Sequence, residues 1–259
     1  MSGRATTVWP STCSGDNPIF INQIYGISNV LRESGQKESV RTLFACVLAA
    51  GFALAAVPAA AQTDLDPGNL TFKDFGIQDQ GASFSKVEST FGNNSANPPP
   101  AKLVGVDAAK GMARVRFDAI KYELGLPLGW QASEDWERGV ATSADKKFRV
   151  IAWRVDFAYE GVRDAEHYAA TKAGSITARR PGIKAQARKL KDGSFLVIYE
   201  NAPAGPGDGG EKRVVFDLVM SKPGNPKEGA LLTLGVPASD ADRGLKLMAL
   251  LKQNIRVDW

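Results

Sequence analysis

The chain contains a single histidine, His167, the residue type that most often performs acid–base chemistry near neutral pH. A general base needs an oriented partner within hydrogen-bond reach. On a helix, Asp164 and Thr171 would lie close to His167, so a Thr/His/Asp arrangement can be drawn. Helical spacing by itself brings such neighbours together, so we interpret His167 as a solvated surface histidine. A metal site built from several histidines is excluded by the count.

Acidic side chains are the remaining candidates for catalysis. Two carboxyl groups that face each other across a pocket, about 5–9.5 Å apart, can divide the roles of acid, base and nucleophile between them. The candidates on or beside predicted strands are Asp156, Glu160, Glu200 and Asp217. Because nothing in their spacing selects a pair, we assign no catalytic residue and keep a carboxylate-based hydrolase as an alternative function.

A glycine-rich stretch and two cysteines bear on cofactors. Residues 205–210 match the pattern G-x-G-x-x-G, which binds dinucleotides when it joins a strand to a following helix. Here a strand is predicted to follow, so we interpret the stretch as a hairpin loop and predict no cofactor. Both cysteines, Cys13 and Cys46, lie in a segment that we expect to be removed. The mature chain would then hold no disulfide, thiol nucleophile or thiolate metal site.

Basic residues and tryptophans form the candidate binding surface. Its members are Arg179, Arg180, Lys184, Arg188, Lys189, Lys191, Trp130 and Trp136. The basic run can meet an acidic partner or phosphates. It lacks interleaved aromatic residues, and exported proteins rarely meet nucleic acid, so we expect no nucleic-acid partner. The competing interpretation is an edge strand whose charges resist edge-to-edge pairing.

The compartment follows from the stretch Leu43–Ala61. It is apolar and uncharged, it follows Lys37 and Arg41, and it ends in the small-x-small triplet Ala59-Ala60-Ala61. These are the parts of a secretory signal peptide, with its apolar region at 43–57 and cleavage after Ala61. We therefore expect a periplasmic or secreted protein. If the stretch is retained instead, the chain is a membrane-anchored periplasmic domain.

The chain has 259 residues and a formal net charge of +4. Its composition divides it into three parts. Residues 1–61 are the N-terminal extension plus signal peptide, and residues 62–100 are a polar lead-in that ends in three prolines. Apolar residues within the lead-in, such as Phe72 and Phe75, are compatible with a strand or a short helix. Residues 101–259 form the globular domain.

Hydropathy patterns place the elements of that domain. Alternation predicts strands over 112–120, 183–190, 194–200, 212–220 and 230–236, with a hairpin of 136–142 and 148–157. Helical spacing predicts a helix over 162–172 and a last helix after Ser239 as its N-cap. Consecutive strands joined by turns pair antiparallel, so the expected fold class is α+β.

The run from Leu124 to Trp259 resembles the PsbP/Mog-type superfamily of α/β/α sandwiches. The residues that carry the resemblance are Leu126-Pro127-Leu128-Gly129-Trp130 entering a hairpin, followed by the helix, the later strands and the closing helix. The resemblance implies a mostly antiparallel sheet flanked by helices and a binding or accessory role. It supplies no catalytic motif that can be placed on this sequence.

Together these observations predict an exported, soluble binding or accessory protein of the bacterial cell envelope. Its partner would be a protein, an envelope component or a small ligand, and membrane contact is expected only if the signal segment is retained. We predict no metal and no cofactor.

Overall fold

The computed structural model describes residues 64–77, 101–204 and 209–259. Two sheets, two α-helices and two short 3-10 helices make up these ranges. The predicted signal segment Leu43–Ala61, both cysteines and residues 205–208 of the glycine-rich stretch lie outside them. The proposed boundaries at residues 61 and 100 therefore remain predictions.

The larger sheet has seven strands, and every neighbouring pair is antiparallel. Its strands are β4 (Gln131–Glu134), β5 (Arg138–Thr142), β6 (Arg149–Asp156), β7 (Lys184–Lys189), β8 (Phe195–Ala202), β9 (Arg213–Lys222) and β10 (Asn225–Pro237). Their order across the sheet is β4-β5-β6-β10-β9-β8-β7. The longest strand, β10, thus lies between β6 and β9 and pairs with both.

A buried run that is apolar except for Thr233 explains why β10 is central. Ala230–Leu234 are all buried, as expected for a strand covered on both faces. Leu232 and Leu234 belong to one core cluster, and Leu231, pointing the opposite way, belongs to the other. The sheet therefore separates two hydrophobic cores.

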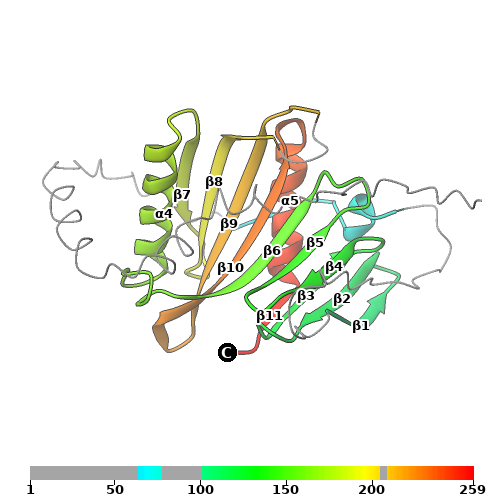
Figure 1. Ribbon diagram of the computed structural model, residues 1–259. Coiled ribbons are helices and arrows are strands. Elements are labelled where there is room, and N and C mark those ends of the chain that lie inside the picture. The colour runs from blue at the N-terminus through cyan, green and yellow to red at the C-terminus, as the bar shows by residue number, and fades with distance from the viewer. Residues whose placement is uncertain (1–63, 78–100, 205–208) are drawn as a thin grey trace, which may run out of the picture. The chain divides into compact units, whose positions relative to one another are not determined.

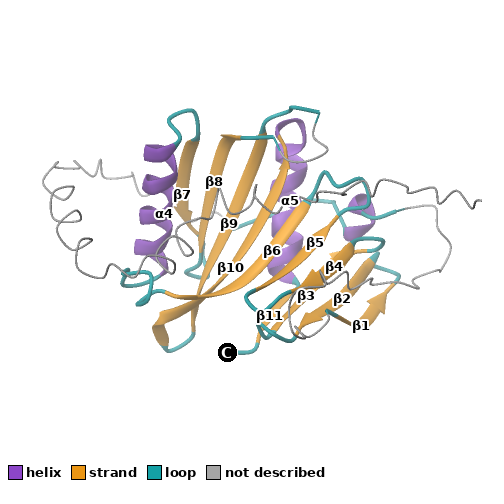
Figure 2. Ribbon diagram, in the orientation of Figure 1, coloured by secondary structure: helices purple, strands orange, loops and turns teal. Residues whose placement is uncertain are grey.

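Helices cover the two faces of this sheet (Figures 1 and 2). Helix α4 (Ala165–Arg179) packs against β7, β8 and β9 on one face. Helix α5 (Ala241–Gln253) packs against β9 and β10 on the other. A Cβ at Gly244 of α5 would approach side-chain atoms of Val236 and Phe216 to 2.8 and 2.9 Å. Helix α5 therefore lies unusually close to the sheet at this point.

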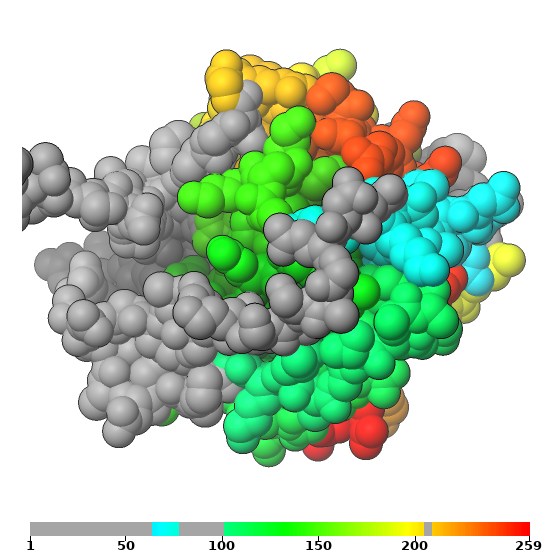
Figure 3. Space-filling view, turned by 90° about the vertical axis from the view of Figure 1, so that its right-hand side faces the viewer, coloured from blue at the N-terminus to red at the C-terminus, as the bar shows by residue number. Residues whose placement is uncertain are grey.

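A second, four-stranded sheet shares the α5 side. Its order is β1-β2-β3-β11, formed by β1 (Lys102–Asp107), β2 (Met112–Phe117), β3 (Tyr122–Pro127) and β11 (Ile255–Val257). Residues 64–77 include the 3-10 helix η1 (Phe72–Phe75), which contacts β3 and α5. In Figure 3 this segment, in cyan, is seen beside α5, in orange. Phe72 and Phe75 are buried, so the first part of the lead-in joins the main core as a short helix.

The expected fold class is confirmed: the fold is α+β, with mostly antiparallel sheets flanked by helices. The predicted hairpin corresponds to β5 and β6. The helix predicted over 162–172 begins at Ala165 and continues to Arg179. The prediction of Ser239 as N-cap is wrong, because Ser239 lies inside the 3-10 helix η2 (Ala238–Asp240) and Asp240 precedes α5.

Candidate functional site

The predicted basic residues lie along one margin of the seven-stranded sheet. Strand β7 is the last strand on that side, and within the described ranges it pairs with β8 alone. The cations sit at the end of α4, on β7 itself and in the turn that follows it. We call this set the basic edge: Arg179, Arg180, Lys184, Arg188, Lys189 and Lys191. Each of its members is exposed or half-buried.

The two faces of β7 differ in chemistry. Lys184, Gln186 and Arg188 lie opposite Glu200, Ile198 and Leu196 of β8, on the face turned toward α5. Ala185 and Ala187 alternate with them on the α4 side. Lys189 shares that side, and its Nζ lies 5.5 Å from the centre of the Phe195 ring. One face of β7 therefore carries Lys184 and Arg188, and the other carries the two alanines with Lys189 at the end of the strand.

Two acidic residues of the described ranges adjoin the basic edge, Glu200 on β8 and Asp192 in the turn after β7. Glu200 lies opposite Lys184 in the strand register. Asp192 accepts hydrogen bonds from Ser194 and lies 2.8 Å from Nζ of Lys252, which belongs to α5 and not to the basic edge. Burial raises the pKa of the Asp192 carboxyl, but the bonds from Lys252 and Ser194 outweigh burial and lower it. Asp192 therefore pairs with α5, on the side of the turn that leads to β8.

The two tryptophans of the predicted surface do not lie with the basic edge. Trp130 is only 7% exposed, and its indole N–H donates to the carbonyl of Phe75 at 2.9 Å. It is a core residue that fixes η1 and cannot contribute an open surface. Trp136 is 56% exposed, between β4 and β5 at the opposite margin of the sheet from β7. The structure thus brings together the six cations and separates them from the tryptophans.

His167 lies in the first turn of α4. Asp164 is the N-cap of this helix, and its carboxylate accepts the backbone N–H of His167 at 2.8 Å. The Nδ1 atom of His167 accepts the backbone N–H of Arg163 at 3.3 Å. Both contacts satisfy backbone N–H groups at the N-terminus of α4, as helix-capping interactions do.

The four candidate carboxylates lie at three places: Asp156 and Glu160 share the turn after β6, Glu200 is on β8 and Asp217 is on β9. Asp156 accepts the backbone N–H of Tyr159 in a turn, and Glu200 is exposed on β8. Asp217 is fully buried on β9, 2.9 Å from Nζ of Lys172 on α4, and accepts a hydrogen bond from Thr233. Among the described residues, no group of three or more His, Cys, Asp or Glu side chains is placed to hold a metal.

Lys172 is a buried charge that the sequence analysis missed. The signal was available, because Ala165, Ala169, Lys172 and Ile176 continue one helical stripe and all four are buried. Its Nζ also lies 5.6 Å from the ring centre of Trp153 and 5.7 Å from that of Tyr168. This ion pair joins α4 to the sheet.

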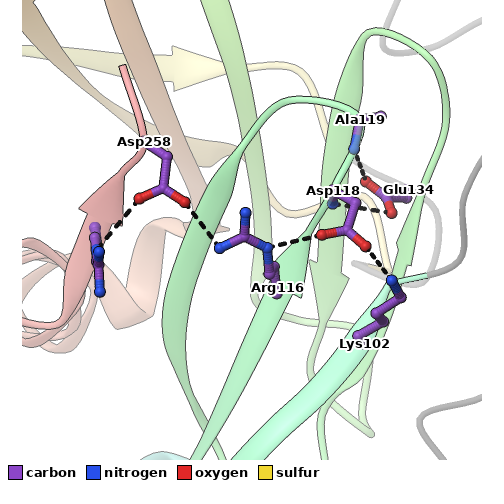
Figure 4. A network of polar contacts seen from close by, with 7 residues as sticks. Lys102, Arg116, Asp118, Ala119, Glu134 and Asp258 are labelled. Atoms are coloured by element: carbon purple, nitrogen blue, oxygen red, sulfur yellow. Dashed lines mark hydrogen bonds and ion pairs between the residues drawn. The ribbon is translucent and has the colours of Figure 1, made fainter.

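A second charged cluster ties the small sheet to the last residues of the chain (Figure 4). Arg116 of β2 donates from Nε to Asp118 at 2.7 Å and from Nη1 to Asp258 at 2.8 Å, while Lys102 pairs with Asp118. Bonds from Lys102 and Arg116 lower the pKa of Asp118, and the bond from Arg116 lowers that of Asp258. These contacts hold the C-terminal residues against β2.

Glu134 lies beside this cluster and is buried. It accepts the backbone N–H groups of Asp118 and Ala119 at 3.2 and 3.0 Å, at the turn that follows β2. Burial raises the pKa of its carboxyl, and the two backbone bonds partly oppose that rise. The geometry is that of a carboxylate closing a turn.

Comparison with solved structures finds two kinds of similar protein. One is the Ran-binding protein Mog1p of Saccharomyces cerevisiae, at 12% identity and a TM-score of 0.40, covering 56% of this chain and 95% of that one. A mutant of Mog1 gives the same values. The other is the cyanobacterial PsbP (CyanoP) of Synechocystis sp. PCC 6803, at 14% identity and 0.40, covering 64% of this chain and 99% of that one.

Both proteins belong to the PsbP/Mog1 fold family, the family that the sequence resembles. The likeness concerns the fold. No family model and no curated protein matches the sequence. None of the helices within residues 64–77, 101–204 and 209–259 is long and apolar enough to cross a membrane.

Proposed function

We propose that this chain is a binding or accessory protein, exported to the periplasm or secreted, that contacts an acidic protein partner through the basic edge. The observation that carries the proposal is the gathering of six cations along the outer strand β7 and its two ends. Asp192, which follows Lys191 in the chain, pairs with Lys252 of α5.

A cluster of six cations affects mainly the rate at which the protein meets a charged partner. Like-signed side chains along one margin attract an oppositely charged surface and raise the rate of encounter. The alternative of a carboxylate-based hydrolase finds less support, because Asp156 and Glu160 belong to one turn, Glu200 lies opposite Lys184 on β8 and Asp217 pairs with Lys172. The alternative of a membrane-anchored domain differs only in the fate of residues 43–61.

Site-directed photocrosslinking in the organism's own cells tests the proposal. A photoreactive residue replaces Gln186 on β7 in one variant and Gln131 on β4 in the other. The two glutamines are both exposed and lie on opposite edge strands of the same sheet. We expect one protein to be captured from position 186 and not from position 131.

A captured protein supports the proposal only if its crosslink depends on the charges of the basic edge. The same crosslink is repeated with Lys184→Glu and Arg188→Glu introduced together, and the purified partner is then titrated with this chain at low and high salt. We expect the reversed charges to abolish the crosslink and salt to weaken the purified complex. A capture that survives charge reversal would contradict the basic edge as the contact surface.

A further inference from the structure

Strand β7 has an open edge whose hydrogen-bonding groups can be assigned. The backbone N–H of Leu190 donates to the carbonyl of Ser194 at 2.8 Å, across the turn to β8. Backbone groups of alternate residues point to opposite edges of a strand, and the β7–β8 register runs without a shift. The N–H and C=O groups of Ala185, Ala187 and Lys189 therefore point away from β8.

Within the described ranges no strand pairs with these outward groups. Such a row is a template for another extended segment. The sheet itself is well supported here, because β8 and β9 are covered by α4 on one face and contribute Leu196 and Leu218 to the core on the other. A well-packed sheet whose edge strand is unpaired on its outer side within these ranges is a suitable template for strand addition.

The side chains of β7 restrict which segment fits. On the α4 side the strand presents Ala185 and Ala187, which leave room for larger side chains of an added strand before Lys189 at its end. On the opposite face it presents Lys184 and Arg188, about 13 Å apart along a strand that rises roughly 3.3 Å per residue. Acidic residues at alternate positions of an added strand would lie beside these cations, since cross-strand pairs of opposite charge are favourable.

The same charges select against self-association. Two copies of β7 brought edge to edge would place cations beside cations, which is destabilising. The same cations can therefore do both: they repel a second copy of β7 and attract a strand that carries acidic residues.

We propose that β7 binds an extended acidic segment of the partner as an additional strand of the seven-stranded sheet. This inference rests on the proposed function and specifies its chemistry. Backbone hydrogen bonds to Ala185, Ala187 and Lys189 would supply the pairing. Alternating acidic side chains would supply the selectivity through Lys184 and Arg188.

Synthetic peptides on the full mature chain test strand addition directly. One peptide alternates glutamate and valine over six residues, and its matched control places the same residues in two blocks. A third repeats the alternating sequence with N-methyl groups on the amides that would face β7. We expect the alternating peptide to bind at least about tenfold more tightly than either control.

Amide hydrogen exchange locates the contact. The alternating peptide should slow exchange at Ala185, Ala187 and Lys189, while Gln186 and Arg188, whose groups already face β8, stay unchanged. Replacing Ala187→Pro removes one outward donor and is expected to weaken peptide binding about tenfold.

The outcomes separate the two proposals. Equal binding of the N-methylated peptide, or binding without protection of the three amides, overturns strand addition but leaves a charge-based contact at the basic edge. Failure of all three peptides, with a crosslink from position 186 that charge reversal abolishes, also overturns strand addition alone. Equal protection by inorganic phosphate or by vesicles of anionic lipid assigns the edge to anions in general and overturns the acidic strand.

Discussion

Lys172 crosses from α4 to the sheet, and its ammonium ends 2.9 Å from the carboxylate of Asp217. Both side chains are buried, so removing one of them leaves the other charge without its counter-ion in a poorly hydrated site. We expect Lys172→Met to lower the free energy of unfolding by about 3–5 kcal/mol. Urea denaturation of the purified chain measures the change.

The double variant Lys172→Met with Asp217→Leu is the control for this pair. Replacing both members by apolar side chains is often close to neutral, so the double variant should recover most of the lost stability. A double variant no more stable than Lys172→Met would contradict the assignment of the effect to an uncompensated charge.

The cluster around Arg116 predicts how stability depends on pH. Asp118 and Asp258 have lowered pKa values because Lys102 and Arg116 stabilise their ionised forms. Their contribution is present above the unfolded pKa of about 3.9 and is lost as the pH falls through the lowered folded values. Glu134 acts oppositely: its raised pKa means that its ionisation opposes folding as the pH rises from about 4.3 through the folded value.

Replacing Arg116→Met isolates the two aspartates. Without the shared cation we expect a shallower loss of stability below pH 4, measured as the urea midpoint at successive pH values. Arg114→Met is the matched control on the same strand, because Arg114 pairs with Glu123 instead. Identical acid profiles for the two variants would show that Arg116 does not set the pKa of Asp118 and Asp258.

At the scale of elements, two helical glycines make a matched pair. A Cβ added at Gly244 of α5 would lie 2.8–3.0 Å from side-chain atoms of Val236 and Phe216. A Cβ added at Gly174 of α4 would have no heavy atom within 4 Å. We expect Gly244→Ala to destabilise the fold by about 1–3 kcal/mol through overpacking. Gly174→Ala should stabilise it by about 0.5–1 kcal/mol through helix propensity.

Thermal unfolding of both variants measures the difference. Both substitutions add one methyl group to a helical glycine. Opposite shifts of the unfolding temperature would therefore reflect how closely each helix packs against its neighbours. A stabilising Gly244→Ala would show that α5 can move away from the sheet at little cost.

Elements with a strong local pattern could be predicted from the sequence, and short ones could not. The run through Ala230–Leu234 predicts a buried strand and is the middle of β10. Strands β4 and β11 have four and three residues and too little alternation to detect. Ile255 continues the helical stripe of α5 in the sequence, yet it pairs with Leu124 in β11. Its place depends on a strand far away in the chain.

The sequence was sufficient to predict a run of basic residues, but not where this run and the two tryptophans lie in the fold. The sequence groups the six cations because they are neighbours in the chain. It cannot separate Trp130 from Trp136, since both precede β5 and differ only in tertiary contacts: one indole bonds to Phe75 and the other is exposed. Lys172 was missed because a charge on the buried stripe of a helix is uncommon.

At the scale of the whole molecule, the predicted export has a direct test. Replacing Ala61→Leu puts a bulky residue at the last position before the expected cleavage, while Ala60→Leu changes the position between the two small residues. We expect the unchanged chain and Ala60→Leu to yield a mature protein that begins at Gln62. Ala61→Leu should accumulate the precursor.

Intact mass and N-terminal sequencing of cell fractions distinguish these forms. Recovery of the unchanged protein in the membrane fraction, with residues 43–61 still attached, would contradict cleavage and favour the anchored alternative. The binding proposal at β7 would be unaffected, because it depends on residues 179–191.

The central position of β10 also sets the order in which the sheet can be completed during synthesis. The hairpin of β5 and β6 and the meander of β7, β8 and β9 are each made from neighbouring residues, but they join only when β10 pairs Asp156 with Glu228 and Val219 with Leu231. Until then the growing chain has two half-sheets with open inner edges, and such edges are where intermediates aggregate. A chain that is translocated before residues 225–237 have paired is still unjoined at its centre. This arrangement delays final closure of the sheet until residues 225–237 have been made, which would keep the two half-sheets unjoined if the chain is exported as predicted.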